Sequence, residues 1–225
     1  MAALSPAAAI AVVIPCYNES GHIADVVSAV RSILPTVIVI DDGSTDDTAG
    51  RARAAGAQVL PLAGNLGKGA ALEAGLRRAT AKGFQYAITM DGDGQHDVAD
   101  LPRFIEAAAA GDADLVVGNR MADVRAMPRV RRFVNRWMSR RLSRRVGRDL
   151  PDTQCGYRLV RLAAWSALEL RTTGFEVESE MLLASVRAGL RVRFVPVRTI
   201  YKSRPSKIHP LRDTLRWFRW WLRAK

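Results

Sequence analysis

Asp91-Gly92-Asp93-Gly94-Gln95-His96 follows directly on the apolar run Tyr86-Ala87-Ile88-Thr89-Met90. An apolar run of this length is typical of a buried strand, so two carboxylates stand where a strand ends. On extended chain, side chains two residues apart leave on the same side, and Asp91 and Asp93 would then offer hard oxygen ligands to one divalent cation. Gly92 and Gly94 leave the backbone open to a ligand that lies close to it. The alternative is an Asp- and Gly-rich turn that binds nothing.

Apolar segments and segments with helical spacing alternate along the first half of the chain. Strands are expected over residues 10–14, 37–40, 58–62 and 84–90. Helices are expected over residues 23–34, from a capping box at residues 44–47 to Gly56, over residues 69–82, and from Pro102 to Gly111. Strands that are apolar throughout and separated by helices predict an α/β fold with a mainly parallel sheet flanked by helices. Ligands of such sheets bind beyond the carboxyl ends of the strands.

The loops expected at that edge are polar and rich in glycine. They cover residues 15–20, 41–44, 64–69 and 91–96. Gly64-Asn65-Leu66-Gly67-Lys68-Gly69 precedes a helix, where free N–H groups and the helix dipole favour a phosphate, although the loop does not match the Walker A pattern. Asp41 and Asp42 either bind the base and ribose of a nucleotide or make a turn and a cap.

Charge divides the chain into two unlike parts. Residues 1–119 carry 8 Lys and Arg against 14 Asp and Glu, whereas residues 120–225 carry 26 against 8. An acidic front with a strongly basic rear fits a metal-assisted site joined to a surface that meets phosphates, anionic lipid or nucleic acid. Cys16 and Cys155 form no metal-ligand pattern and are expected to be reduced thiols in the cytoplasm. No apolar stretch approaches the ~18 residues of a membrane span.

Two segments of the basic half combine apolar residues at helical spacing with arginines. Residues 128–150 contain nine arginines around an apolar series, and residues 211–225 contain four arginines and three tryptophans. Basic amphipathic helices rich in Trp lie among lipid headgroups, so both segments are expected to bind an anionic membrane surface. Packing against a membrane-protein partner or a second copy of the chain is the alternative. The loops expected to bind the donor lie in the first half, so residues 211–225 are not expected to affect donor affinity.

Ordered motifs make the chain resemble the family 2 glycosyltransferases of the GT-A fold. The motifs are Val12-Val13-Ile14-Pro15-Cys16-Tyr17-Asn18-Glu19, Val39-Ile40-Asp41-Asp42-Gly43-Ser44-Thr45-Asp46, Met90-Asp91-Gly92-Asp93-Gly94-Gln95-His96 and Val116-Val117-Gly118-Asn119-Arg120. More narrowly, the chain resembles the dolichol-phosphate mannose synthase and polyprenyl-phosphate glycosyltransferase branch. That resemblance rests on Asp152-Thr153-Gln154-Cys155-Gly156-Tyr157-Arg158, Phe175-Glu176-Val177-Glu178-Ser179-Glu180-Met181 and residues 201–208.

The resemblance implies a GT-A (nucleotide-diphospho-sugar transferase) domain over residues 10–208. A flexible N-terminus over residues 1–9 and an amphipathic membrane-interface helix over residues 209–225 would complete the chain. Mg2+ or Mn2+ would be held by Asp91, Asp93 and Gln95. Taken with the loops above, the residues expected to bind the donor nucleotide are Pro15, Tyr17, Glu19, Asp41, Asp42, Asn65, Lys68, Asp91 and Gly92.

The acceptor side is expected to need positively charged groups more than a base. A phosphate monoester has a second pKa near ~6 and is largely a dianion at neutral pH. Arginine forks match phosphate oxygens, and the acceptor candidates are Arg120, Arg131, Arg132, Lys202, Arg204 and Lys207. The expected catalytic residues are Asp93, Arg120 and Asp152. Asp152, with Glu178 behind it, would be an acid-base or acceptor-orienting carboxylate, or else a cap or an ion-pair partner of a nearby arginine.

These observations predict a metal-dependent, inverting glycosyltransferase peripheral to the cytoplasmic face of the cell membrane. It would transfer a hexosyl unit from a nucleotide sugar, GDP-mannose or UDP-glucose being the family's usual donors, to a polyprenyl phosphate. A saccharide or lipid hydroxyl is the alternative acceptor. A non-catalytic basic module bound to nucleic acid or membrane is the alternative from another class. Nucleic acid is not expected as a partner, because the ordered carboxylate loops would repel a polyanion.

Overall fold

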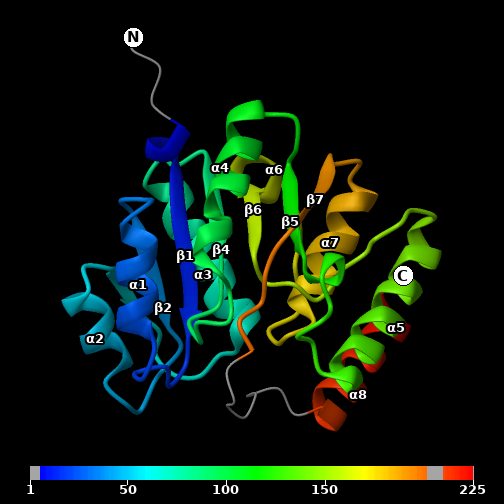
Figure 1. Cartoon of the computed structure of the whole chain (residues 1–225), viewed down its shortest axis with the longest axis horizontal. Coiled ribbons are helices and arrows are strands. Elements are labelled where there is room, and N and C mark those ends of the chain that lie inside the picture. The colour runs from blue at the N-terminus through cyan, green and yellow to red at the C-terminus, as the bar shows by residue number, and fades with distance from the viewer. Residues whose placement is uncertain (1–5, 202–209, 225) are drawn as a thin grey trace.

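The computed structural model describes residues 6–201 and 210–224, which are built around a seven-stranded sheet (Figure 1). The strands are β1 (Ile10–Cys16), β2 (Val37–Asp41), β3 (Gln58–Pro61), β4 (Tyr86–Thr89), β5 (Leu115–Asn119), β6 (Arg158–Arg161) and β7 (Val192–Pro196). Their order is β3-β2-β1-β4-β6-β5-β7, and all neighbours are parallel except β6, which is antiparallel to β4 and β5. The predicted mainly parallel α/β sheet is confirmed.

Helices surround this sheet. They are α1 (Ile23–Arg31), α2 (Thr48–Ala54), α3 (Lys68–Ala81), α4 (Leu101–Ala110), α5 (Arg129–Val146), α6 (Leu162–Trp165), α7 (Val177–Arg187) and α8 (Pro210–Arg223), with short 3-10 turns η1 (Pro6–Ala9), η2 (Val98–Asp100) and η3 (Arg120–Ala122). Helices α5 and α8 lie side by side at the end of the molecule away from α1 and α2 (Figure 1). Within the described residues, no helix is both long and apolar enough to span a membrane.

The four strand–helix units of the first half are confirmed, apart from one helix start. Helix α2 begins at Thr48 after Asp47, whose side chain makes no capping hydrogen bond, so the predicted capping box over residues 44–47 is wrong. The Ser44 hydroxyl is engaged elsewhere, because it accepts a hydrogen bond from the backbone N–H of Asn18 at 2.9 Å. Asp46 instead accepts from the Thr48 N–H at 3.0 Å. Residues 6–9, expected to be flexible, form η1, and Ala9 is buried.

The central strands are buried, and their common direction determines the edge at which the loops that follow them meet. All of residues 10–14 and 37–40 are buried, as expected for strands covered on both faces. Because β1, β2, β3, β4, β5 and β7 run the same way, the loops that follow them leave from one edge of the sheet. Strand β6 runs the opposite way, so residues 152–157, which precede it, reach the same edge.

Candidate active site

An ion-pair cluster at the carboxyl edge joins three distant parts of the chain. Lys68 Nζ, at the start of α3, lies 2.6 Å from Asp91 Oδ1 after β4 and 2.6 Å from Glu178 Oε1 in the first turn of α7. His96 Nε2 lies 3.2 Å from Asp91 Oδ2. The ammonium group also lies over the Phe175 ring, 5.6 Å from its centre. Asp91 is therefore held between one lysine and one histidine.

The protonation states of this cluster follow from its geometry. Burial alone would raise the pKa of Asp91, but Lys68 and the His96 hydrogen bond more than offset it and hold the pKa well below its usual range. Burial would lower the pKa of Lys68, but the two carboxylates raise it above its ordinary value. Asp91 is thus a carboxylate and Lys68 an ammonium at neutral pH.

Backbone atoms of the 152–158 motif form the floor of the cluster. A Cβ atom on Gly156 would lie 3.1 Å from Lys68 Nζ and 3.2 Å from both carboxylate oxygens of Asp91, so glycine allows the close approach. Arg158 is buried and donates to the carbonyl oxygens of Cys155 and Glu178, both at 2.7 Å. This arginine ties the floor to the start of α7. Pro15, one of the expected donor residues, lines a small cavity of about 10 Å³ beside Lys68 and Asp91.

The loop that carries Asp93 is a turn. The chain turns at Gly92 and Asp93, so the premise that Asp91 and Asp93 lie on extended chain is wrong. Asp93 Oδ1 accepts a hydrogen bond from the Gln95 N–H at 2.9 Å, and Gln95 Oε1 accepts from Arg131 at 3.2 Å. A Cβ atom on Gly92 would lie 2.5 Å from Cys16 Sγ, so the turn packs directly on the end of β1.

Asp41 and Asp42, expected to bind the nucleoside, both hold loop backbone in this structure. Asp41 Oδ1 accepts from the Ser44 N–H at 3.1 Å. The two oxygens of Asp42 accept from the N–H groups of Leu66 and Gly67 at 2.8 and 2.9 Å. Burial raises the pKa of Asp42, and the two amide bonds oppose that rise. Asp41 therefore makes the local turn contact of the alternative interpretation, whereas Asp42 holds the distant residue 64–69 loop, a role that neither interpretation predicts.

The remaining donor candidates lie around this loop. Tyr17 and Asn65 are exposed at the same edge of the sheet. Glu19 is half-buried, and its N–H donates to the Thr48 hydroxyl at 2.8 Å. The structure thus brings the first-half candidates to one edge, although their contacts with a nucleotide stay a prediction.

Arg120 and Asp152 form a buried, bidentate ion pair. Arg120 Nε and Nη2 donate to the two Asp152 oxygens at 2.8 and 2.9 Å, and the N–H groups of Arg120 and Gln154 donate to the same carboxylate at 3.0 and 3.1 Å. The Asp152 side chain is 0% exposed and that of Arg120 is 12% exposed. Burial would raise the pKa of Asp152, but Arg120 holds it below its ordinary value. This arrangement favours the ion-pair alternative over an acid-base role.

The other acceptor candidates are divided between α5 and the segment before α8. Arg131 reaches Gln95 and lies over the Tyr201 ring, 5.7 Å from its centre, so it borders the carboxylate loop. Arg132 lines a groove along α5. Lys202, Arg204 and Lys207 lie outside the described residues. One arginine is thus brought to the site and one is not.

The carboxylates of the site fit a divalent cation whose other ligands are phosphate oxygens and water. Among the described residues, no three His, Cys, Asp or Glu side chains form a metal cluster. Asp91 and Asp93 offer hard carboxylate oxygens in one turn, and the Asp91 oxygens lie next to Lys68 on one side and His96 on the other. Mg2+ is typically bound through one or two carboxylates plus phosphates and water. Two carboxylates are therefore a sufficient protein contribution.

Sequence reasoning did not find the cluster's other members. Glu178 is only the second candidate, after Asp152, for an acid-base or acceptor-orienting carboxylate, and neither its contact with Lys68 nor that of His96 with Asp91 is predicted. Thr173 was not singled out, although its carbonyl oxygen accepts from the Gly69 N–H at 2.7 Å. The Phe175-Glu176-Val177-Glu178 motif was the only signal that this region belongs to the site.

The fold and the carboxylate-lined edge define a glycosyltransferase of the GT-A class. The model of the family described as Glycosyl transferase family 2 matches residues 11–167, and the chain belongs to this family. It is an enzyme of the glycosyltransferase type, as predicted.

Individual relatives agree with this assignment. The chain is 36% identical over 214 residues to glycosyltransferase AglJ of Haloferax volcanii, an alignment that covers 91% of this chain and 68% of the relative. It is 31% identical over 204 residues to the undecaprenyl-phosphate mannosyltransferase of Micrococcus luteus, covering 85% and 83%. The resemblance to the polyprenyl-phosphate branch is confirmed.

A solved structure confirms the GT-A fold. It is glucosyl-3-phosphoglycerate synthase from Mycobacterium tuberculosis in complex with Mn2+, UDP-glucose and phosphoglyceric acid. The TM-score is 0.76 with 24% sequence identity, covering 98% of this chain and 82% of that one. At this identity the likeness concerns the fold alone.

Proposed function

We propose that this glycosyltransferase moves a hexosyl unit from a nucleotide sugar, of the GDP-mannose or UDP-glucose type, to a polyprenyl phosphate at the cytoplasmic membrane surface. The reaction is metal-dependent and inverts the anomeric centre. The observation that carries the proposal is the Lys68–Asp91–Glu178 cluster at the carboxyl edge, together with the arginine-rich pair of helices beside it. The names of the polyprenyl-phosphate relatives support the same acceptor.

We assign the donor diphosphate to the residue 64–69 loop and the Asp91 turn, because both follow parallel strands and lie at the same edge of the sheet. Lys68 supplies a positive charge at the N-terminus of α3, where the helix dipole favours an anion. Mg2+ or Mn2+, held by Asp91 and Asp93 with Gln95 nearby, would neutralise the charge that develops on the leaving nucleoside diphosphate. Asp42 acts through the loop that it clamps.

The acceptor phosphate requires positioning, because it is already largely ionised at neutral pH. Arg131 borders the turn that carries Asp93 and Gln95 and is the described arginine best placed for this task. Asp152 is engaged in its ion pair with Arg120 and does not serve as a base. A phosphate acceptor is compatible with this arrangement, because its reaction needs no protein base. A hydroxyl acceptor would need a base that this pair does not supply.

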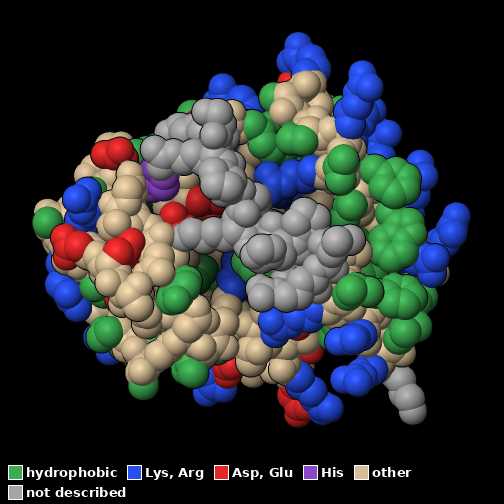
Figure 2. All heavy atoms as spheres, turned by 90° about the horizontal axis from the view of Figure 1, so that it is seen from below, with side chains coloured by type: hydrophobic (Ala, Val, Ile, Leu, Met, Phe, Trp, Pro, Cys, Tyr) green, Lys and Arg blue, Asp and Glu red, His purple; other side chains and the backbone are tan. Residues whose placement is uncertain are grey.

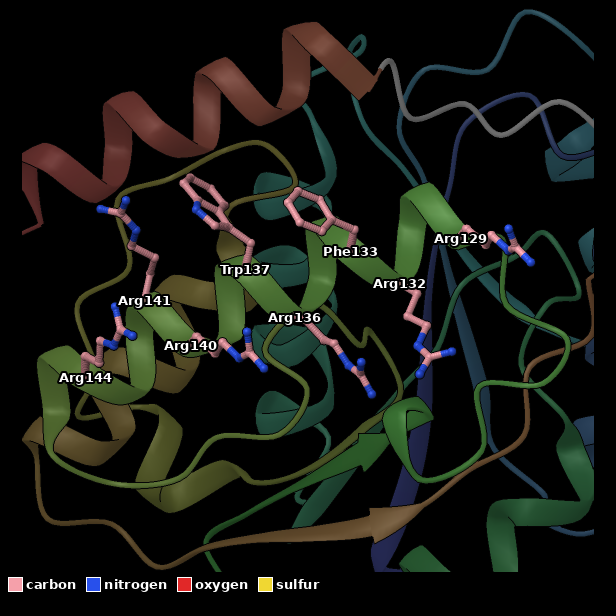
Figure 3. Close-up of a pocket in the computed structure, with 8 residues that line it drawn as sticks. All are labelled: Arg129, Arg132, Phe133, Arg136, Trp137, Arg140, Arg141 and Arg144. Carbon is pink, nitrogen blue, oxygen red and sulfur yellow. The ribbon is translucent and has the colours of Figure 1, made fainter.

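Helices α5 and α8 form the surface proposed to meet the membrane. Six arginines with Phe133 and Trp137 line a groove of about 440 Å³ along α5 (Figure 3): Arg129, Arg132, Arg136, Arg140, Arg141 and Arg144. Phe133 of α5 is 71% exposed and Leu222 of α8 is 60% exposed. Figure 2 shows the view onto the carboxyl edge, where hydrophobic side chains bordered by Lys and Arg gather on the side of α5 and α8. Exposed apolar groups among arginines match an anionic lipid surface.

A transfer assay tests the proposed reaction. Purified protein is given labelled GDP-mannose, UDP-glucose or UDP-N-acetylglucosamine with Mn2+, Mg2+ or EDTA, and either undecaprenyl phosphate or undecaprenol as acceptor. We expect product on the phosphate with one donor and metal, and none in EDTA. Transfer to undecaprenol alone would replace the phosphate acceptor by a hydroxyl, and activity in EDTA would refute the metal dependence.

A vesicle experiment tests the proposed surface. The Phe133→Ser/Leu222→Ser variant removes two exposed apolar side chains, each worth about 1.5–3 kcal/mol when fully buried. We expect binding to vesicles with anionic lipid to fall at least about tenfold, which corresponds to 1.4 kcal/mol. Unchanged vesicle binding, or tight binding of single-stranded nucleic acid in place of vesicles, would refute the membrane assignment.

A further inference from the structure

Two adjacent residues connect helix α8 to α7 and to the segment that precedes α7. Trp217 is only 2% exposed, and its indole N–H donates to Ser179 Oγ in α7 at 2.8 Å. Arg216 Nε donates to Glu176 Oε1 at 2.8 Å, and Arg216 Nη2 donates to Thr173 Oγ1 at 3.3 Å. Helix α8 is thus fixed to the segment that leads into α7.

That segment is one wall of the loop expected to bind the diphosphate. The Gly69 N–H donates to the Thr173 carbonyl oxygen at 2.7 Å. A Cβ atom on Gly67 would lie 2.4 Å from the same oxygen, and one on Gly69 would lie 2.3 Å from the Thr172 carbonyl oxygen. Backbone therefore packs on backbone at both glycines, which flank Lys68. A shift of residues 172–174 must move the loop or break this contact.

Two side chains hold residues 171–174 in place. From α7, Glu180 accepts hydrogen bonds from the N–H groups of Arg171 and Thr172, at 3.0 and 2.9 Å. From α8, the Arg216 guanidinium lies against Gly174, where a Cβ atom would be only 2.4 Å from Arg216 Cζ. The Glu176 side chain is 8% exposed, so removal of Arg216 would leave a buried carboxylate without its ion-pair partner.

We propose that Arg216 is a positioning residue for the donor loop, so that the helix assigned to the membrane also sets the affinity for the nucleoside diphosphate. The identity of the ligand rests on the proposed function, but the contacts that connect α8 to the residue 64–69 loop do not. Arg216 contacts Glu176 and Thr173, and the Thr173 carbonyl oxygen accepts a hydrogen bond from Gly69, the neighbour of Lys68. This gives α8 a role on the donor side that the sequence did not suggest.

The test compares Arg216→Gln with Arg219→Gln. Arg219 is exposed on the same helix, and the described part of the chain offers it no ion pair, so both variants lose one positive charge from α8. Hydrogen exchange reports on the amides of residues 66–70 without any ligand. Calorimetry with GDP and with UDP, each with Mn2+, gives the affinity for the diphosphate, and anionic vesicles report on the membrane surface.

We expect Arg216→Gln to speed exchange at residues 66–70 by about tenfold and to weaken diphosphate binding by about threefold to tenfold. Arg219→Gln should match wild type in both measurements, and the two variants should bind vesicles equally. Glu176→Gln should reproduce the Arg216→Gln effect, and the double variant should lose little more, because the pair acts as a unit. In turnover the donor KM should rise while kcat at saturating donor changes little.

Equal exchange and equal affinity in Arg216→Gln and Arg219→Gln would overturn the positioning role. Faster exchange in Arg216→Gln, in a protein whose wild type binds neither GDP nor UDP, would leave the positioning role standing and refute the proposed donor. A change confined to vesicle binding would assign Arg216 to the membrane surface alone and overturn the inference.

Discussion

The Arg120–Asp152 pair offers the sharpest test of how the acceptor side is built. Both side chains are buried, and every oxygen of Asp152 accepts hydrogen bonds from Arg120 or from the Gln154 N–H. Removing one member of a buried pair typically costs about 3–5 kcal/mol, because the other charge stays buried without compensation. For a chain of this size, that loss corresponds to a fall in melting temperature of roughly 6–20 °C.

The assay is urea unfolding of Arg120→Met, Asp152→Asn and the double variant, followed by tryptophan fluorescence at pH 7. We expect each single variant to lose stability in that range. The double variant should lose less than the sum of the two, with a coupling of about 1–3 kcal/mol, because no charge is then left alone. Asp152→Asn should show turnover in proportion to its folded fraction.

The pH dependence follows from the direction of the pKa shift. Arg120 holds the pKa of Asp152 below its unfolded value, so the pair stabilises the fold above that value and loses its effect as the pH falls through the folded pKa. The gap between wild type and Asp152→Asn should therefore be full at pH 7 and narrow below about pH 4. An Asp152→Asn variant as stable as wild type, yet without turnover, would refute this reasoning and make Asp152 a reacting group.

Three further predictions concern other residues in and around the site. Asp93→Asn should abolish metal-dependent transfer and the metal dependence of diphosphate binding. The free energy of unfolding should change by less than about 1 kcal/mol, because asparagine can still accept a hydrogen bond from the Gln95 N–H. Near-wild-type activity would contradict the metal assignment. Gly92→Ala should cost about 1–3 kcal/mol through overlap with Cys16 Sγ, and Cys16→Ala in the same chain should restore most of it in urea unfolding. Burial raises the pKa of Cys155 to about 12, so its thiol should resist iodoacetamide in the native protein at pH 8 and react only on unfolding, as mass spectrometry would show.

The elements of the first half could be predicted because their signals are local. A strand buried on both faces is apolar throughout, as residues 10–14 are, and a helix packed on it repeats apolar residues at helical spacing. The direction of parallel strands then places their following loops at one edge, which is why Lys68 and Asp91 could be assigned to one site before any contact was known. Antiparallel β6 brings residues 152–157 to that edge, and nothing local in the sequence encodes that reversal.

Contacts between distant elements could not be predicted, because they depend on how helices pack. Glu178 lies 110 positions from Lys68, and its carboxylate reaches the ammonium in a region where Arg158 connects the start of α7 to residue 155. The capping-box prediction was wrong for the same reason, a contact with a distant residue. Ser44 fits the local pattern, but its hydroxyl accepts from Asn18, which lies 26 residues earlier.

The two amphipathic helices show why a basic, Trp-rich pattern is ambiguous. In α8, Trp217 is buried in the core while Leu215 and Leu222 are exposed, so one helix carries both a packing face and a face available to lipid. The sequence cannot distinguish the two roles, since a tryptophan that packs inside the protein and a tryptophan that contacts lipid recur at the same helical spacing. The structure shows which residues pack against the protein: Trp217 donates to Ser179, and Arg216 donates to Glu176. If α8 binds a membrane and the residue 64–69 loop binds the donor, as we propose, a shift of this helix would also pull on residues 172–174, which pack against that loop. By thermodynamic reciprocity, any factor by which lipid changes diphosphate affinity is also the factor by which the diphosphate changes lipid affinity.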